Sequence, residues 1–290
     1  MENFRSFRNI AATQVTRLDT KIKPQTTYST YSGPTFFSSL AKIATPILTA
    51  QLPVAQIISQ KVDKKLSVPN LIQGHNECGP TSLAMIEKYF GIDPGNYHDM
   101  FYSDTVGHGP NALKEKAAAK NLTVRQQNNG SLADLAALVD KGIPALVLGI
   151  NGGGSNSTLS DYISNAPRGH WMAVTGYKKD DSGKITHIYF NNPNQSTTQC
   201  WTASDFQSKF WDNNLVPGGH RYYMAMAPRG TFQESLLKTY LPYDKTSDTF
   251  KLYLDIIDGL EDAFYTAEKA ADEIASAADS VWDTITGWFS

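Results

Sequence analysis

The chain has 290 residues, of which 41% are hydrophobic and 19% charged, and its formal net charge is -2. This composition is that of an ordinary globular protein with one substantial core. The near-neutral charge gives no general electrostatic reason to bind nucleic acid or an anionic membrane. Two cysteines are too few for a disulfide scaffold. No apolar run of 18 residues and no Sec-type signal are found, so neither a transmembrane segment nor Sec export is expected.

The first 66 residues are polar, rich in Thr, Ser and Gln, and contain nine Lys or Arg and three acidic residues. We interpret 1–66 as a basic N-terminal arm that is partly disordered, with one or two short helices broken at prolines within 36–65. Residues 245–290 contain three Lys and ten acidic residues. The two ends could therefore attract each other, or each could face a partner of opposite charge.

From residue 67 onwards the pattern changes to compact alternating elements. Ser131 is a suitable N-cap for one of the helices, and the turn KKDDSGK predicts an antiparallel hairpin. Helices followed by an antiparallel sheet indicate an α+β domain over 67–230. The expected helices cover 79–90, 110–120 and 131–141, and the expected strands cover 144–150, 170–177, 187–192 and 221–227.

The remaining segment, 231–290, is predicted to be an acidic amphipathic helical tail. Beyond Pro242, apolar residues recur at spacings of three and four from Phe250 to Trp288, which indicates one long helix or two shorter ones. Its opposite face is acidic, which does not suit an anionic membrane surface. The apolar stripe would pack on the protein itself or on a second copy, or it would bind a partner.

The stretch NECGPTSLAMIEKYFGI places Cys78 directly before a predicted amphipathic helix. A nucleophilic cysteine must be a thiolate, and free N–H groups and the dipole at a helix N-terminus lower the thiol pKa. Gly79 allows close backbone approach, and Pro80 is tolerated in the first helical turn. Cys78 is therefore a candidate nucleophile, although a free cysteine is also often a small buried apolar residue.

A thiolate nucleophile needs a histidine that is held on rigid structure. His170 opens the strand HWMAVTGY, so a scaffold could fix its ring. Asn192, in FNNPN after the next strand, would lie beside His170 if the two strands pair, and it could orient the imidazole. Asn191 is the fallback, although side-chain alternation would point it to the opposite face.

The segments ECGPTSLAMIEKYFG, GHWMAVTGY and IYFNNPN resemble the three motif blocks of the papain-like cysteine peptidases. They are most similar to the branch of double-glycine leader peptidases of bacteriocin exporters and their soluble relatives. The resemblance covers about residues 67–227. It implies a papain-like fold in which the nucleophile helix packs on an antiparallel sheet, and a Cys–His–Asn/Asp triad.

The resemblance also implies that Gln73 donates to the oxyanion together with the Cys78 N–H. Gln73 lies five residues before Cys78, where papain has a spacing of six. The branch usually carries Asp before Pro as the third triad member, and this chain has Asn192 before Pro193. Asn can orient a histidine through its carbonyl oxygen but supplies no charge.

These features predict a cysteine peptidase without metal or cofactor, which the resemblance suggests cleaves after small residues such as Gly-Gly. The flanking arms suggest a bacterial effector or toxin, made in the cytoplasm and exported without a Sec signal, whose arms contact a chaperone, an immunity protein or a secretion machine. An acyltransferase or glutamine deamidase on the same thiol, or an inactive binding module, is the alternative. The glycine-rich segment 151–157 is read as a loop near the site that could act as a lid.

Overall fold

The computed structural model describes residues 61–99, 108–151, 168–212, 216 and 219–287, all within a compact unit that spans 59–290. The rest of the expected N-terminal arm, most of the glycine-rich loop and the last three residues lie outside these ranges. The elements are β1 Val62–Lys65, α2 Cys78–Tyr89, η1 Tyr97–Asp99, α3 Pro110–Ala119, β2 Leu122–Gln127, α4 Leu132–Asp140, β3 Ala145–Ile150, β4 Gly169–Lys179, β5 Ile185–Asn191, β6 Gln199–Thr202, α6 Ala203–Phe206, η3 Gln207–Trp211, β7 Tyr223–Pro228, α7 Phe232–Tyr240 and α8 Asp248–Gly287.

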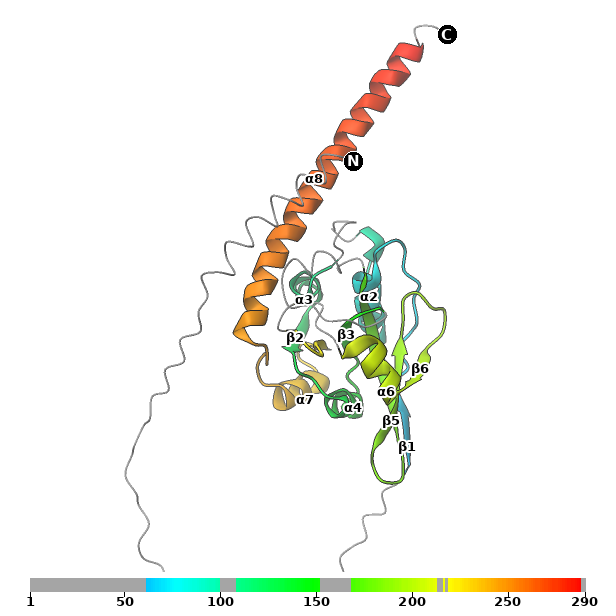
Figure 1. The fold of residues 1–290 in the computed structure, drawn as a ribbon, viewed down its shortest axis with the longest axis vertical. Coiled ribbons are helices and arrows are strands. Elements are labelled where there is room, and N and C mark those ends of the chain that lie inside the picture. Colours follow the sequence, from blue (N-terminus) through cyan, green and yellow to red (C-terminus); the bar gives the residue numbers. More distant parts are fainter. Residues whose placement is uncertain (1–60, 100–107, 152–167, 213–215, 217–218, 288–290) are drawn as a thin grey trace, which may run out of the picture. The chain divides into compact units, whose positions relative to one another are not determined.

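One antiparallel sheet organises the described residues (Figure 1). Its strands follow the order β2-β7-β3-β4-β5-β6, and β1 pairs with the far end of β4. Helices and an antiparallel sheet together confirm the predicted α+β class. The four predicted strands are all present, whereas β1, β2 and β6 were not expected. Of the segment 36–65, where one or two short helices are expected, only 61–65 is described, and there Val62–Lys65 forms a strand that pairs with β4.

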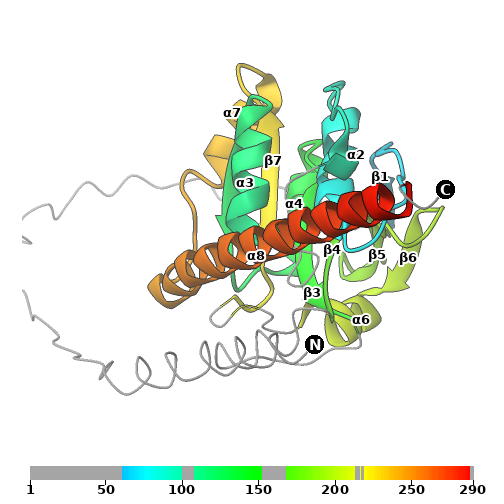
Figure 2. The same cartoon turned by 90° about the horizontal axis from the view of Figure 1, so that it is seen from above.

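The two faces of β4 pack against different helices, as strand alternation requires. Met172 and Val174 belong to a large apolar cluster with residues of α4, α6, η3 and α7. Helix α2 makes its main contacts with β4. Figure 2 shows α2 and α6 on opposite sides of β3 and β4. Both sides of β4 are therefore covered, and the strand is a rigid support for the residues that begin it.

Local signals account for several boundaries. Ser131 caps α4, and its hydroxyl accepts the Asp134 N–H while the Asp134 carboxylate accepts the Ser131 N–H. Gly142 follows α4 with a φ of 72°, which favours glycine. The hairpin between β4 and β5 is also present, and the Asp180 carboxylate accepts the N–H groups of Ser182 and Lys184 in its turn. Capping and turn chemistry thus fix these ends.

The segment before the nucleophile helix runs along the paired ends of β4 and β5. After β1, the Leu66 N–H donates to the Thr175 carbonyl oxygen at 2.8 Å. The Asn191 side-chain amide then donates to the Val68 carbonyl oxygen at 3.0 Å. These bonds carry the chain from the sheet edge to the start of α2, so the loop before Cys78 is anchored to β5.

The C-terminal segment packs on the same core over its first part. Leu237 of α7 lies in the main apolar cluster, and Phe250, Leu254 and Ile257 of α8 are buried. The predicted tail is one 40-residue helix preceded by a short one. The boundary between a peptidase domain ending at 230 and a tail beginning at 231 stays a prediction. None of the described helices is long and apolar enough to cross a membrane.

Candidate active site

Cys78 is the first residue of α2, where the chain turns into the helix. The first helical hydrogen bond runs from the Thr81 N–H to the Glu77 carbonyl oxygen at 3.0 Å. Pro80 lies in the first turn, where its missing N–H leaves no partner unsatisfied. A Cβ on Gly79 would come within 2.9 Å of the His108 Cβ and 3.2 Å of a Leu113 methyl carbon. The predicted close approach at Gly79 is confirmed, since only glycine lets α2 pack this tightly.

The backbone of Trp171 docks the nucleophile helix onto β4. Its carbonyl oxygen accepts the Ser82 hydroxyl at 3.1 Å, and hydrogen bonding from the Trp171 backbone acts to lower the pKa of Cys78. These groups are available because β5 pairs with β4 only from Ala173 onwards. Cys78 and Ser82 lie four residues apart and so share one face of α2. The first turn of α2 therefore packs along the part of the β4 edge that β5 leaves unpaired.

The side chain of Trp171 adds a second anchor. Its indole N–H donates to the His108 carbonyl oxygen at 2.9 Å, and the residue is 2% exposed. His108 also packs against Gly79, one residue after the nucleophile. The same segment before α3 therefore contacts both the strand that carries His170 and the helix that carries Cys78.

His170 and Asn192 are joined directly. The His170 Nε2 and the Asn192 Oδ1 are 2.8 Å apart. The Asn194 backbone N–H also donates to Asn192 Oδ1, at 3.0 Å, and a backbone N–H can only donate. This atom is therefore the amide oxygen, so His170 Nε2 carries the hydrogen and Nδ1 is left with a lone pair.

Asn191 faces a different environment. It is completely buried, and its amide group donates to the carbonyl oxygens of Val68 and Pro69. Asn192 is the residue that contacts His170, as the predicted pairing of the two strands requires. Asn191 instead fastens the segment that precedes the nucleophile loop.

Gln73 is fixed through its backbone to the neighbour of Asn192. Its N–H donates to the Pro193 carbonyl oxygen at 2.9 Å. The side-chain oxygen of Gln73 is buried and has no hydrogen-bond partner among the described residues. That oxygen can only accept a hydrogen bond, and the NH2 group of the same side chain is the part that could donate to an oxyanion. The structure thus brings Gln73 to Pro193, Asn192 to His170, and Cys78 to the residue after His170.

The electrostatics of the thiol differ from the sequence expectation. Burial raises the pKa of Cys78 to about 11, although the N–H groups of Trp171, Gly79 and Cys78 itself oppose the rise. Burial likewise lowers the pKa of His170, and the hydrogen bond with Asn192 acts in the opposite direction. The expectation of a lowered thiol pKa is wrong for the resting state, because desolvation outweighs the helix N-terminus. Both shifts disfavour the charged forms of the thiol and the imidazole.

Sequence reasoning missed the contributions of Trp171, Ser82 and Glu77. The Glu77 carboxylate accepts the Gly74 N–H at 2.7 Å and contacts His98 Nδ1 at 2.6 Å. Only the spacing of Ser82 from Cys78 could have been read from the sequence. The other contacts join segments whose proximity depends on the folded chain.

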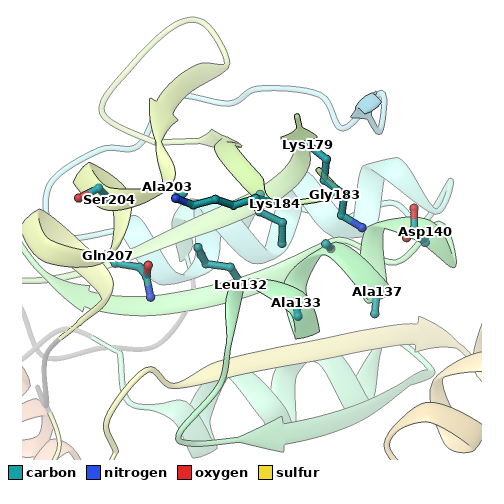
Figure 3. A pocket seen from close by; sticks show the side chains of 12 residues that line it. Leu132, Ala133, Ala137, Asp140, Lys179, Gly183, Lys184, Ala203, Ser204 and Gln207 are labelled. Carbon is teal, nitrogen blue, oxygen red and sulfur yellow. The ribbon is translucent and has the colours of Figure 1, made fainter. Parts of the chain in front are cut away.

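A separate groove of about 550 Å³ lies between α4, the hairpin of β4 and β5, and α6 (Figure 3). Small residues such as Ala133 and Ala137 line one side, and Lys184 lies across from them. Cys78, His170, Asn192 and Gln73 are not among its lining residues. The groove therefore does not contain the candidate catalytic groups.

Comparisons with known proteins agree with the motif resemblance. The sequence model of the Peptidase_C39 like family matches residues 65–214, which is more than half of the chain. No curated protein matches.

Three solved structures share between 15% and 17% of their residues with this chain. A putative C39-like peptidase from Bacillus anthracis has 16% identity and a TM-score of 0.43, with 59% of this chain and 100% of that chain covered. The peptidase domain of Streptococcus ComA, a bifunctional ABC transporter involved in a quorum-sensing pathway, has 17% identity, a TM-score of 0.36 and coverage of 56% and 99%. A double glycine motif protease from an AMS/PCAT transporter, in complex with the leader peptide, has 15% identity, a TM-score of 0.35 and coverage of 58% and 99%.

The raised thiol pKa predicts how Cys78 reacts with iodoacetamide, an uncharged reagent. In a Cys200→Ser background only Cys78 can react. Because the thiolate fraction grows as pH approaches the pKa of about 11, the rate should rise about tenfold per pH unit from pH 7 to pH 9. A rate that is constant from pH 5 to pH 8 would instead show a thiolate–imidazolium pair at rest and contradict the prediction.

Proposed function

We propose that this chain, which belongs to the Peptidase_C39 like family and is a cysteine peptidase, cleaves peptide bonds with Cys78 as nucleophile and His170 as proton carrier. Asn192 orients the imidazole, and Gln73 with the Cys78 N–H stabilises the oxyanion. The observation that carries this proposal is the contact of Asn192 Oδ1 with His170 Nε2 at 2.8 Å. It leaves His170 Nδ1 as the only ring nitrogen able to accept a proton.

Acylation begins from uncharged partners. The Cys78 sulfur attacks the carbonyl carbon of the scissile bond while the thiol proton moves to His170 Nδ1. Burial disfavours the separated charges, so the developing imidazolium needs the Asn192 oxygen that Nε2–H already contacts. The hydrogen bond from Asn194 holds that oxygen in place.

The tetrahedral intermediate then collapses. The C–N bond breaks, and His170 gives its Nδ1 proton to the departing amine. Water next attacks the thioester and passes a proton to His170 Nδ1, and breakage of the S–C bond returns this proton to the sulfur. In both halves the negative charge on the carbonyl oxygen is stabilised by fixed N–H donors.

The motif resemblance also supports cleavage after small residues such as Gly-Gly. Transfer of the acyl group to an amine, or attack on a glutamine side chain, would use the same thioester. The difference lies in which nucleophile or amide reaches the sulfur, so product analysis separates these reactions.

The peptidase proposal is tested with a proteome-derived peptide library and mass spectrometry. The wild-type chain should cut the library, with small residues before the cut, and Cys78→Ala should abolish all cuts. Asn192→Ala should slow cleavage about 10- to 100-fold, because the imidazole loses its orienting partner. Cys200→Ser is the matched control and should cut like the wild type.

Uncut peptides for every variant would refute hydrolysis of short peptides. Amine-dependent products or ammonia release would then assign acyl transfer or deamidation. Cuts that persist in Cys78→Ala would exclude Cys78 as the nucleophile.

A role as a delivered effector or toxin is the more specific form of this proposal. The acidic segment 245–290 gives it an element for contact with a basic partner. If the role is right, cytosolic expression of the full chain in bacterial target cells should impair growth, whereas Cys78→Ala should not. Equal growth with both chains at equal expression would contradict the role.

A further inference from the structure

The Glu77 carboxylate forms a hydrogen bond within the loop Gln73–Cys78 and does not cap the helix that follows. Glu77 is the N-cap residue of α2, yet its side chain makes no capping hydrogen bond to that helix. N-cap side chains ordinarily accept the N–H of the second or third helical residue. The Glu77 carboxylate instead turns back into the loop.

Within the loop, Glu77 Oε2 accepts the Gly74 N–H at 2.7 Å. This bond closes the turn one residue after Gln73 and one residue before Cys78. A Cβ on residue 74 would come within 2.6 Å of Oε2, and Asn76 between them has a φ of 53°, in the left-handed region. The loop conformation thus depends on the carboxylate at its centre.

His98 holds the carboxylate from outside the loop. Its Nδ1 lies 2.6 Å from Glu77 Oε2, and the Glu77 side chain is 20% exposed. His98 belongs to η1, which also contacts α2. The carboxylate is therefore fixed from two directions, by a backbone N–H and by an imidazole.

The other end of the loop, at Gln73, is bonded to the segment that carries Asn192, the partner of His170. The Gln73 N–H donates to the Pro193 carbonyl oxygen, one residue after Asn192. Gln73 is therefore held between two bonds, its own to Pro193 and that of Gly74 to Glu77. Loss of either bond would release Gln73 from its present position.

We propose that Glu77 is a positioning residue of the oxyanion hole. Its carboxylate, held by His98, sets the loop so that the Gln73 amide and the Cys78 N–H point at one oxygen. Glu77 does not touch the substrate and acts through Gln73. The inference rests on the proposed function, because it assumes that Gln73 stabilises an oxyanion.

The experiment compares two reactions of the same thiol in the full chain with Cys200→Ser. Acylation by the p-nitrophenyl ester of an N-blocked glycine forms the S–C bond, breaks the C–O bond and releases p-nitrophenolate, with an oxyanion in between. Alkylation by iodoacetamide forms an S–C bond at a saturated carbon and displaces iodide, without an oxyanion. A misplaced oxyanion hole slows only the first reaction.

Glu77→Ala should slow the nitrophenolate burst about 10- to 100-fold and leave the alkylation rate at or above that of the parent. Glu77→Gln keeps an oxygen that can accept the Gly74 N–H, so it should recover most of the lost rate. The burst rate of His98→Ala should lie between those of Glu77→Ala and Glu77→Gln. Glu115→Ala removes a carboxylate from an exposed residue of α3 and should react like the parent in both assays.

The outcomes separate the two proposals. A parent burst that depends on Cys78 and is unchanged in Glu77→Ala would overturn the role of Glu77 and leave the peptidase proposal standing. Equal slowing of acylation and alkylation would also overturn it, since the thiol itself would then be disturbed. A parent without any burst would contradict the peptidase proposal, and the role of Glu77 with it.

Discussion

The active-site arrangement depends on one stretch of strand edge, the backbone of Trp171. Its carbonyl oxygen accepts the Ser82 hydroxyl, and its backbone acts to lower the pKa of Cys78. Buried backbone groups need partners, and α2 supplies them where β5 leaves β4. The same departure of β5 carries Asn192 to the ring of His170. The end of the pairing between β4 and β5 therefore places the nucleophile beside the residue after His170 and gives His170 its orienting partner.

The same packing disfavours the charged forms of both the Cys78 thiol and the His170 imidazole. Packing the sulfur and the imidazole away from water disfavours both charged forms, in opposite pKa directions. The helix N-terminus and the Trp171 N–H oppose that effect without overcoming it. A pair whose charged forms are disfavoured by desolvation favours proton transfer during attack on a substrate. A preformed ion pair would be favoured only if the attraction between the two charges outweighed their desolvation.

The sequence was sufficient for those parts of the site that depend on local chemistry. Gly79, Pro80 and the amphipathic run after Cys78 predict the nucleophile helix, and the hairpin turn predicts that Asn192 returns to His170. Strand alternation also separates Asn191 from Asn192.

Other parts depend on contacts that sequence patterns do not encode. Strand β2 lacks an apolar alternation because it has buried polar residues such as Gln126, whose side-chain oxygen accepts the hydroxyl of Tyr222, the residue just before β7. Strands β1 and β6 have four residues each, too few for a periodic signal. The direction of the Cys78 pKa depends on how deeply α2 packs, and the bond between Gly74 and Glu77 depends on loop conformation.

In the proposed mechanism, Asn192 holds a neutral His170 whose Nδ1 takes the thiol proton. Nitrogen NMR of ¹⁵N-histidine-labelled full-length protein at pH 7 tests it directly, with the His170 signals assigned by their loss in His170→Ala. We expect a neutral ring that is protonated at Nε2 and has an unprotonated Nδ1. A ring protonated at both nitrogens, or at Nδ1 alone, would contradict it.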